Sequence, residues 1–326
     1  MVAAAIAVAG CTFDDSSEPP LEYDFTVAGA NPRDLATADL TAPLPWQTQA
    51  AGLTAVTLNG VAGAGDEVYA VGDQGTILRT ADRGAHWNKL QSGTNAVLFG
   101  VWTDGSVVFA VGYAGLVLRS VDHGQSWQST TLGNDIIGVV TGLTTSGDGG
   151  WNGEIWAAGE NAFVAHSTDG GLTWITQRLG GNPFIAGIWA SPSETFVVSE
   201  TYDIERTRDH GATWTEVSSA RGTGIWSNGG GDFVVSDDDG IEVSHDGALA
   251  FSDVGGAQSI KTVGLAAFAD GNAFAPAVER VVRHVANDFG SEVADEPIDG
   301  VPRAIWGSDE HNLFVVGDGG FIAHRP

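Results

Sequence analysis

One eight-residue pattern recurs along the chain, and it limits the possible folds more than any other feature. The pattern is a Ser or Thr, an Asp two positions later, a Gly two positions after that, and a Trp three positions further on. Four complete copies run over residues 80–87, 120–127, 167–174 and 207–214, and a worn fifth copy runs over residues 244–251. The steps between successive aspartates are 40, 47, 40 and 37 residues, for Asp82, Asp122, Asp169, Asp209 and Asp246.

This period is the length of one four-stranded blade of a β-propeller. The composition agrees, because 46 glycines and 11 tryptophans are typical of a turn-rich all-β chain. Each unit also carries a first strand, in several units ending in Trp, and a second strand that in several units ends in Gly. We therefore expect an all-β, seven-bladed propeller with units that begin near residues 54, 95, 134, 182, 222, 257 and 298, the sixth being the most degenerate.

The last unit ends at Pro326, before it reaches an eight-residue motif or a fourth strand. The missing piece is present near the other end of the chain, where Trp46 to Gly52 repeats the spacing of Trp87 to Gly93. We predict that the strand near Trp46 completes the seventh blade. This closure would leave no exposed sheet edge in the ring. The propeller would then span residues 43–326, after a polar tether over residues 12–42.

The eight-residue motif, the Asp-box, has a structural chemistry. Its aspartate can accept hydrogen bonds from the backbone of its own tight turn, and its glycine permits a positive φ. The Ser or Thr hydroxyl can brace the turn, and the aromatic residue can pack between sheets. We predict that the aspartates are structural and not catalytic, and that the sheets are joined by Trp87, Trp127, Trp174 and Trp214.

These motifs resemble those of the photosystem II stability/assembly factor family and its broader bacterial relatives, which are seven-bladed Asp-box propellers. The chain is also similar, more loosely, to sialidase-type repeat proteins, sortilin and the oligoxyloglucan hydrolases. The resemblance covers residues 43–326. It implies the fold and a non-catalytic binding or assembly role, although many functions share this scaffold.

Equivalent positions of the blades form rings around a propeller axis. One such column, six residues after the second-to-third strand turn, is basic at six of seven positions: Arg79, Arg119, His166, Arg206, Val243, Arg283 and His324. One interpretation is structural, with each cation paired to a carboxylate of the adjacent blade or to its own Asp-box turn. The other is a surface that binds a partner or an anion. The resemblance implies arginines shared between blades, with Arg79, Arg119, Arg206 and Arg283 as the candidates.

The turn between the second and third strands carries a second column, acidic at five of seven positions: Asp73, Tyr113, Glu160, Glu200, Asp237, Ala277 and Asp318. Aspartates in tight turns commonly bind local backbone groups. A ring also spreads the carboxylates apart, whereas calcium needs six or more converging oxygens. We predict neither a metal site nor a cofactor.

The charge excludes some partners and the missing motifs exclude some activities. The formal net charge of −27 repels nucleic acid. We expect a monomer that binds a protein or a carbohydrate. The alternative is a glycoside hydrolase, suggested only by Tyr202 near Glu200 and Glu205. The chain lacks the Arg-Ile-Pro motif of sialidases, a Gly-x-Ser-x-Gly elbow and the second propeller of xyloglucan-type hydrolases.

The single cysteine, Cys11, follows the apolar run Val2 to Gly10. Val8 to Cys11 resembles the lipobox of bacterial lipoproteins, in which the cysteine receives a diacylglycerol after export. The run is short and no Lys or Arg precedes it, which departs from the usual pattern. The alternative is a disordered apolar terminus. We expect residues 1–11 to be a lipoprotein-type signal segment, with the propeller lipid-anchored in the cell envelope on the periplasmic or surface side.

Overall fold

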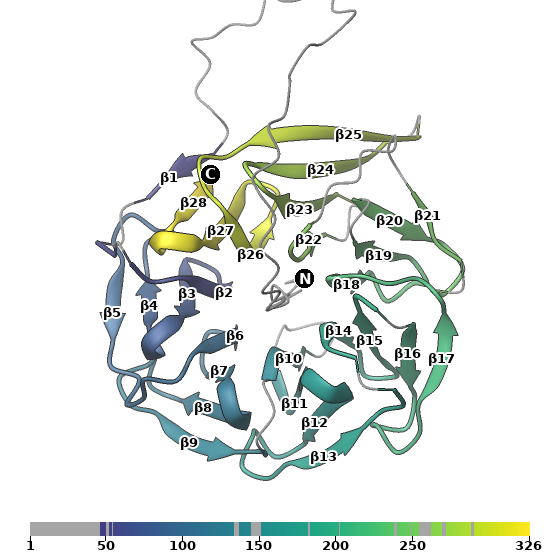
Figure 1. The fold of residues 1–326 in the computed structure, drawn as a ribbon, viewed down its shortest axis with the longest axis horizontal. Coiled ribbons are helices and arrows are strands. Elements are labelled where there is room, and N and C mark those ends of the chain that lie inside the picture. Colours follow the sequence, from purple (N-terminus) through teal and green to yellow (C-terminus); the bar gives the residue numbers. More distant parts are fainter. Residues whose placement is uncertain are drawn as a thin grey trace, which may run out of the picture.

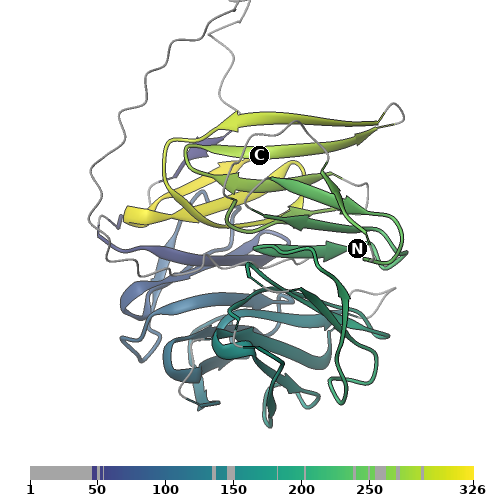
Figure 2. The ribbon, with the colours of Figure 1, turned by 45° about the vertical axis from the view of Figure 1, so that its right-hand side comes forward.

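The computed structural model describes residues 46–49, 52–53, 55–133, 137–144, 151–181, 183–201, 203–237, 240–248, 250–253, 262–268, 272–287 and 290–326. These residues form seven four-stranded antiparallel sheets arranged as the blades of a ring (Figure 1). Figure 2 shows the blades from another side, packed face to face. The predicted seven-bladed propeller is therefore confirmed. In the described residues, no helix is long and apolar enough to cross a membrane.

The first four blades follow the chain in order, with the first strand of each nearest the ring centre (Figure 1). Blade 1 contains β2 (Leu58–Ala64), β3 (Glu67–Gly72), β4 (Ile77–Thr80) and β5 (Asn88–Leu90). Blade 2 contains β6 (Leu98–Thr103), β7 (Val108–Gly112), β8 (Leu116–Ser120) and β9 (Gln128–Thr131). Blade 3 contains β10 (Ile137–Thr144), β11 (Trp151–Gly159), β12 (Phe163–Ser167) and β13 (Ile175–Arg178). Blade 4 contains β14 (Ile185–Ala190), β15 (Thr195–Ser199), β16 (Ile204–Thr207) and β17 (Thr215–Ser218).

The last three blades complete the ring. Blade 5 contains β18 (Gly224–Ser227), β19 (Phe233–Ser236), β20 (Ile241–Ser244) and β21 (Ser252–Asp253). Blade 6 contains β22 (Ala266–Ala267), β23 (Ala273–Ala277), β24 (Arg280–Asn287) and β25 (Gly290–Pro297). Blade 7 contains β26 (Pro302–Asp309), β27 (Asn312–Gly317), β28 (Ile322–Arg325) and, as its outer strand, β1 (Gln47–Thr48). Gln47 pairs with His324 and Thr48 with Ala323, so the predicted closure by the N-terminal strand is confirmed.

Among the described residues, a short 3-10 turn joins the second and third strands in four blades: η1 (Asp73–Gly75), η2 (Tyr113–Gly115), η3 (Glu160–Ala162) and η4 (Asp318–Gly320). The glycine that ends the second strand lies against the first strand of its own blade. A Cβ on Gly72 would lie 2.0 Å from the Thr57 carbonyl oxygen, and one on Gly317 would lie 1.9 Å from that of Val301. Glycine is required there because no side chain fits between the two backbones.

Large aromatic residues fill the space within and between the sheets. Trp102 and Trp306 on the first strands are fully buried. Trp306 reaches the first strand of the next blade, since a Cβ on Gly63 would lie 2.7 Å from its ring. Such close packing joins blade 7 to blade 1, and the buried apolar side chains of the described residues form four clusters around the ring.

Candidate functional site

The Asp-box carboxylates are occupied by their own turns. In blade 2, Asp122 Oδ1 accepts hydrogen bonds from Ser120 Oγ at 2.7 Å and from the Ser126 amide at 2.9 Å. Asp122 Oδ2 accepts one from Ser126 Oγ at 2.5 Å, and Ser120 Oγ accepts one from the Gly124 amide at 2.8 Å. Hydrogen bonds from Ser126 and Ser120 lower the Asp122 pKa to about 2. The same lowering of the pKa to about 2 occurs at Asp82, Asp169 and Asp209.

The worn motif in blade 5 keeps part of this network. Asp246 Oδ1 accepts hydrogen bonds from Ser244 Oγ at 2.7 Å and from the Ala250 amide at 3.1 Å. Ala248 stands where the other copies have Gly and adopts a φ of 69°. The turn therefore persists although its glycine is lost.

The Asp-box tryptophans lie between neighbouring blades. Trp87 of blade 1 makes an edge contact with Phe314 of blade 7, with ring centroids 6.0 Å apart. Trp174 contacts Phe109 of blade 2 in the same way at 6.4 Å. Trp214 of blade 4 contacts Trp156 of blade 3 at 6.0 Å, and Trp127 packs partly buried against the same core. The turns of blades 1, 3 and 4 thus each hold their blade to the preceding one in the ring.

The basic column lies on the third strands, close to the Asp-boxes, and its first member is neutralised inside its own blade. Arg79 on β4 forms an ion pair with Glu67, at the start of β3. Glu67 also accepts a hydrogen bond from Tyr69, and His123 of the blade 2 Asp-box lies 3.1 Å from it. Burial alone would raise the Glu67 pKa, but hydrogen bonds from Tyr69, Arg79 and His123 outweigh burial and lower it. This carboxylate is a structural joint between blades 1 and 2.

Two arginines of the column contact neutral groups. Arg119 Nε donates a hydrogen bond at 2.7 Å to the carbonyl oxygen of Gly170, in the Asp-box of blade 3. Arg119 Nη1 lies 3.4 Å from Gln128 Oε1. The Arg206 guanidinium lies over the Phe196 ring, 5.9 Å from its centroid. These two side chains carry positive charge that the described contacts do not pair with a carboxylate.

His166 replaces an arginine in blade 3 and is buried. Its ring stacks on Trp156 at a centroid distance of 3.8 Å. Its Nε2 lies 2.9 Å from Glu154 Oε1, and His210 Nδ1 of the blade 4 Asp-box lies 3.3 Å from the same oxygen. Burial would raise the Glu154 pKa, but hydrogen bonds from both histidines outweigh it and lower that pKa.

The two remaining Arg or His members of the column lie in blades 6 and 7. Arg283 Nη2 is 3.3 Å from Glu310 of blade 7, and its guanidinium lies 5.7 Å from the Phe274 ring centroid. His324 Nε2 is 2.9 Å from Asn312 Oδ1, and its ring stacks on Phe314 at 4.2 Å. Burial lowers the His324 pKa.

The structural interpretation of this column needs correction in one respect. Only Arg283 pairs with a carboxylate of the adjacent blade in the way that we expected, whereas Arg79 and His166 use an acid of their own blade. Sequence reasoning missed these acids, which stand two residues before the second-strand residue that pairs with the basic position. An alignment of that position would have found them, since four of its members are acidic: Glu67, Glu154, Glu194 and Asp232.

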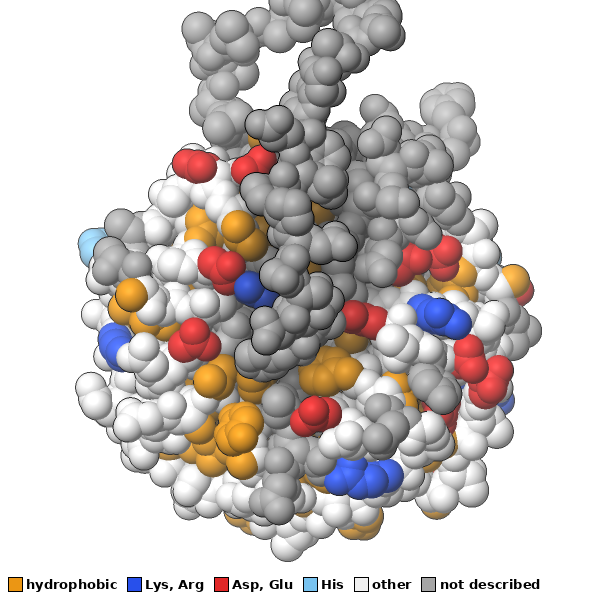
Figure 3. All heavy atoms as spheres, in the orientation of Figure 1, with side chains coloured by type: hydrophobic (Ala, Val, Ile, Leu, Met, Phe, Trp, Pro, Cys, Tyr) orange, Lys and Arg blue, Asp and Glu red, His pale blue; other side chains and the backbone are white. Residues whose placement is uncertain are grey.

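The acidic column is separate from the basic one. Asp318 on η4 pairs with Arg303 of its own blade at 2.8 Å. Asp73 on η1 lies 3.4 Å from both the Thr57 amide and Asn59 Nδ2. Charged side chains are scattered over the described part of the face in Figure 3. Asp73 and Asp318 thus interact within their own blades.

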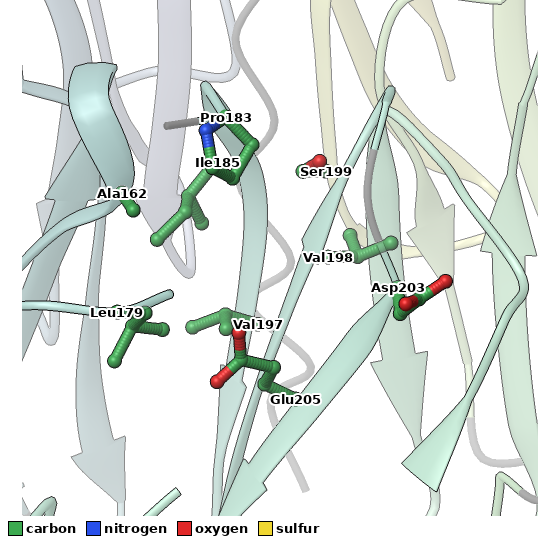
Figure 4. A pocket seen from close by; sticks show the side chains of 9 residues that line it. All are labelled: Ala162, Leu179, Pro183, Ile185, Val197, Val198, Ser199, Asp203 and Glu205. Atoms are coloured by element: carbon green, nitrogen blue, oxygen red, sulfur yellow. The ribbon is translucent and has the colours of Figure 1, made fainter. Parts of the chain in front are cut away.

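A small pocket between blades 3 and 4 contains Glu205 (Figure 4). Its empty volume is about 230 Å³ with open solvent included, below the roughly 300–1,000 Å³ of small-molecule sites. Burial raises the Glu205 pKa, and the charges of Glu216 and Asp203 raise it further. In Figure 4 the Asp203 carboxylate points away from Glu205. Tyr202, which the sequence places near Glu200 and Glu205, lies outside the described residues.

Seven four-stranded blades, five of them with an Asp-box turn, are closed by an N-terminal strand and define the class as a seven-bladed Asp-box β-propeller. A family model, described as photosynthesis system II assembly factor YCF48, matches residues 38–152. The predicted resemblance to the propellers of this family is therefore confirmed.

Solved structures show the same fold at low sequence identity. "YCF48 bound to D1 peptide" is 17% identical with a TM-score of 0.66, and the alignment covers 86% of this chain and 96% of that one. "YCF48 from Cyanidioschyzon merolae" is 14% identical with a TM-score of 0.67, covering 86% and 98%. A catalytically inactive virginiamycin B lyase from Staphylococcus aureus with quinupristin is 15% identical with a TM-score of 0.70, also covering 86% and 98%. A comparison with curated proteins found no match.

Proposed function

We propose that the protein is a non-catalytic binding module that assists assembly by engaging a protein partner. The observation that carries this proposal is the match of the assembly-factor family model to residues 38–152. One similar structure is bound to a peptide, which agrees with a protein partner. The Asp-box carboxylates also support it, because their own turns occupy them.

The surface proposed for the partner is the basic column where its charge is not neutralised. Arg119 and Arg206 are partly exposed and contact neutral groups in the described part of the chain. In a chain of net charge −27, such positive positions are few. They would attract an acidic segment of a partner, with an affinity that falls as salt rises.

The test begins with cross-linking in the native host and identification of the captured protein. Binding of that purified protein is then measured at low and high salt for the wild type and for the double variant Arg119→Ala, Arg206→Ala. We expect weaker, less salt-dependent binding in the double variant and none of this loss in Lys89→Ala, which removes the same kind of charge from the exposed strand β5. Equal binding by all three proteins would refute the proposed surface. A captured glycan in place of a protein would refute the partner class.

Glycoside hydrolysis is the second candidate because the pKa of Glu205 is raised, as that of a general acid must be. A panel of sialosides and β-glucans tests it. We expect no turnover by the wild type. Turnover that Glu205→Gln abolishes, while the variant still folds, would replace the binding proposal.

We also propose that the propeller is exported and held at a membrane by a lipid on Cys11. The support is the sequence alone, since the only cysteine stands directly after the apolar run that ends at Gly10. Residues 1–45 lie outside the described residues.

A further inference from the structure

Three side chains with metal-binding atoms converge at the seam between blades 3 and 4. Glu154 lies on β11, His166 on β12, and His210 in the Asp-box turn of blade 4. One ligand atom from each lies within 4.8 Å of the other two. Glu154 and His166 are nearly buried, with side chains 11% and 6% exposed, whereas the His210 side chain is 63% exposed. The cluster therefore has a fixed inner part and a movable outer part.

The seam between blades 1 and 2 has the same construction with one difference. Glu67 corresponds to Glu154, because each stands two residues before the cross-strand partner of the basic residue. His123 corresponds to His210, since each follows the Asp-box aspartate and adopts nearly the same φ, 56° and 54°. The third position is Arg79 in one seam and His166 in the other.

The structural joint does not need the histidine, because arginine makes it in blade 1. An arginine has only donors and cannot ligate a metal, whereas a neutral imidazole offers a lone pair. Replacement of the arginine by His166 thus gives this seam two imidazoles and a carboxylate around one point.

We propose that Glu154, His166 and His210 bind a divalent transition-metal ion of the zinc class, which links blade 3 to blade 4. Two imidazoles and one carboxylate suit zinc and not calcium or magnesium, which take oxygen ligands. Ligands on a tetrahedral zinc ion are about 3.3 Å apart, given metal–ligand bonds of about 2.0–2.1 Å. Glu154 Oε1 is 2.9 Å from His166 Nε2 and 3.3 Å from His210 Nδ1.

The ion requires one movement that the structure permits. A metal lies in the plane of each imidazole that binds it, but the rings of His166 and His210 are stacked, with 8° between their planes and 6.2 Å between centroids. His166 is fixed by its stacking on Trp156, so His210 must rotate. Each imidazole keeps its proton on the nitrogen that does not bind the ion. Three protein ligands leave a fourth position for water on the solvent side.

The test is a titration of the full chain, freed of metal by chelation, with Zn²⁺ by isothermal calorimetry, and with Co²⁺ by visible absorption as a report on coordination. We expect one saturable Zn²⁺ site that survives excess Mg²⁺ and Ca²⁺. His210→Ala should lower the Zn²⁺ affinity by at least about tenfold, since it removes a ligand. His166→Arg should abolish the site. The new arginine can pair with Glu154 in blade 3, as Arg79 pairs with Glu67 in blade 1.

The matched control is His123→Ala, which removes the corresponding histidine from the seam between blades 1 and 2 and should leave the Zn²⁺ affinity unchanged. Absence of saturable Zn²⁺ binding by the wild type would overturn the proposal. So would equal affinities of the wild type and His210→Ala, or an equal loss in His123→Ala. If His166→Arg fails to fold, the comparison of His210→Ala with His123→Ala still decides the question.

Discussion

At the residue scale, the Asp-box carboxylates couple stability to pH. The folded pKa of Asp122 is about 2, below its ordinary 3.8. Its contribution is therefore present above pH 3.8 and is lost as the pH falls through about 2. We predict that Asp122→Asn is less stable than the wild type near neutral pH and that the difference shrinks toward pH 2.

Urea unfolding at several pH values measures this difference. Ser126→Ala is the graded control, because it removes the hydrogen bond that lowers the Asp122 pKa most. It should show a smaller loss in the same pH window. A difference between wild type and Asp122→Asn that stays constant down to pH 2 would contradict the role assigned to this carboxylate.

Arg79 and Arg119 occupy the same column but should respond differently to truncation. Arg79→Ala leaves Glu67, whose side chain is 13% exposed, without its arginine. We expect a loss of about 1–3 kcal/mol in the free energy of unfolding. Arg119→Ala removes hydrogen bonds to a neutral carbonyl and a neutral amide, leaves no charged partner behind, and should cost less. Thermal and urea unfolding of the two variants measure this difference. Equal losses of stability would show that the nearly buried Glu67 carboxylate does not need Arg79 as its partner.

The sequence predicted the Asp-box turns at this scale because their partners lie within five residues of each aspartate. It did not predict the seams, because each seam joins three separate segments. Glu67 and Arg79 are 12 residues apart, and Glu67 and His123 are 56 apart. The strand register pairs Tyr69 with Arg79. Glu67 stands two residues before Tyr69 on the same strand, so its side chain is on the same face of the sheet as those of Tyr69 and Arg79.

At the scale of the strand, β1 joins three blades. Its backbone pairs with β28 of blade 7. Trp46 Nε1 donates a hydrogen bond at 2.8 Å to Glu296 of blade 6, and Gln49 accepts one at 2.9 Å from Trp87 of blade 1. The strand has only two residues, so few backbone hydrogen bonds join it to β28. The side chains of Trp46 and Gln49, on either side of it, add the contacts that hold the ring closed.

We predict that Trp46→Ala destabilises the propeller by about 3–5 kcal/mol, since the indole is 5% exposed and its loss leaves a cavity. Deletion of residues 43–52 should lower the melting temperature further. Thr48→Ala, an exposed position on the same strand, is the control and should change stability by less than about 0.5 kcal/mol. Melting of Trp46→Ala at the wild-type temperature would show that the ring does not depend on this closure.

The sequence predicted this strand because the spacing from Trp46 to Gly52 repeats that of complete blades. Blade 6 was harder to place because it lacks the repeat signals. Its strands β24 and β25 form a hairpin joined near Asn287 and Gly290, with no Asp-box between them. The backbone pairing of a hairpin sustains this blade where side-chain motifs are absent.

At the scale of the whole molecule, the fold was predictable and the function was not, and the reason is physical. The blade repeat is encoded by residues that face inward, such as Trp102 in the core and Gly72 against a neighbouring backbone segment. We propose that a partner is recognised by outward groups such as Arg119 and Arg206, and the scaffold alone does not determine which groups stand there. The fold can therefore be predicted from the inward-facing residues, whereas a prediction of the partner depends on the outward-facing ones.

The location that we predict for the molecule depends on one residue outside the propeller. We predict that Cys11 receives a lipid after export, because an apolar run followed by a cysteine is what this modification uses. Labelling with a fatty-acid probe in the native host, followed by fractionation, should mark the wild type and find it with membranes. Cys11→Ser should be unlabelled and released, while its melting temperature stays the same, since residues 43–326 form the predicted propeller domain. Equal labelling of both proteins would exclude Cys11 as the attachment site, and an unlabelled wild type would exclude the anchor.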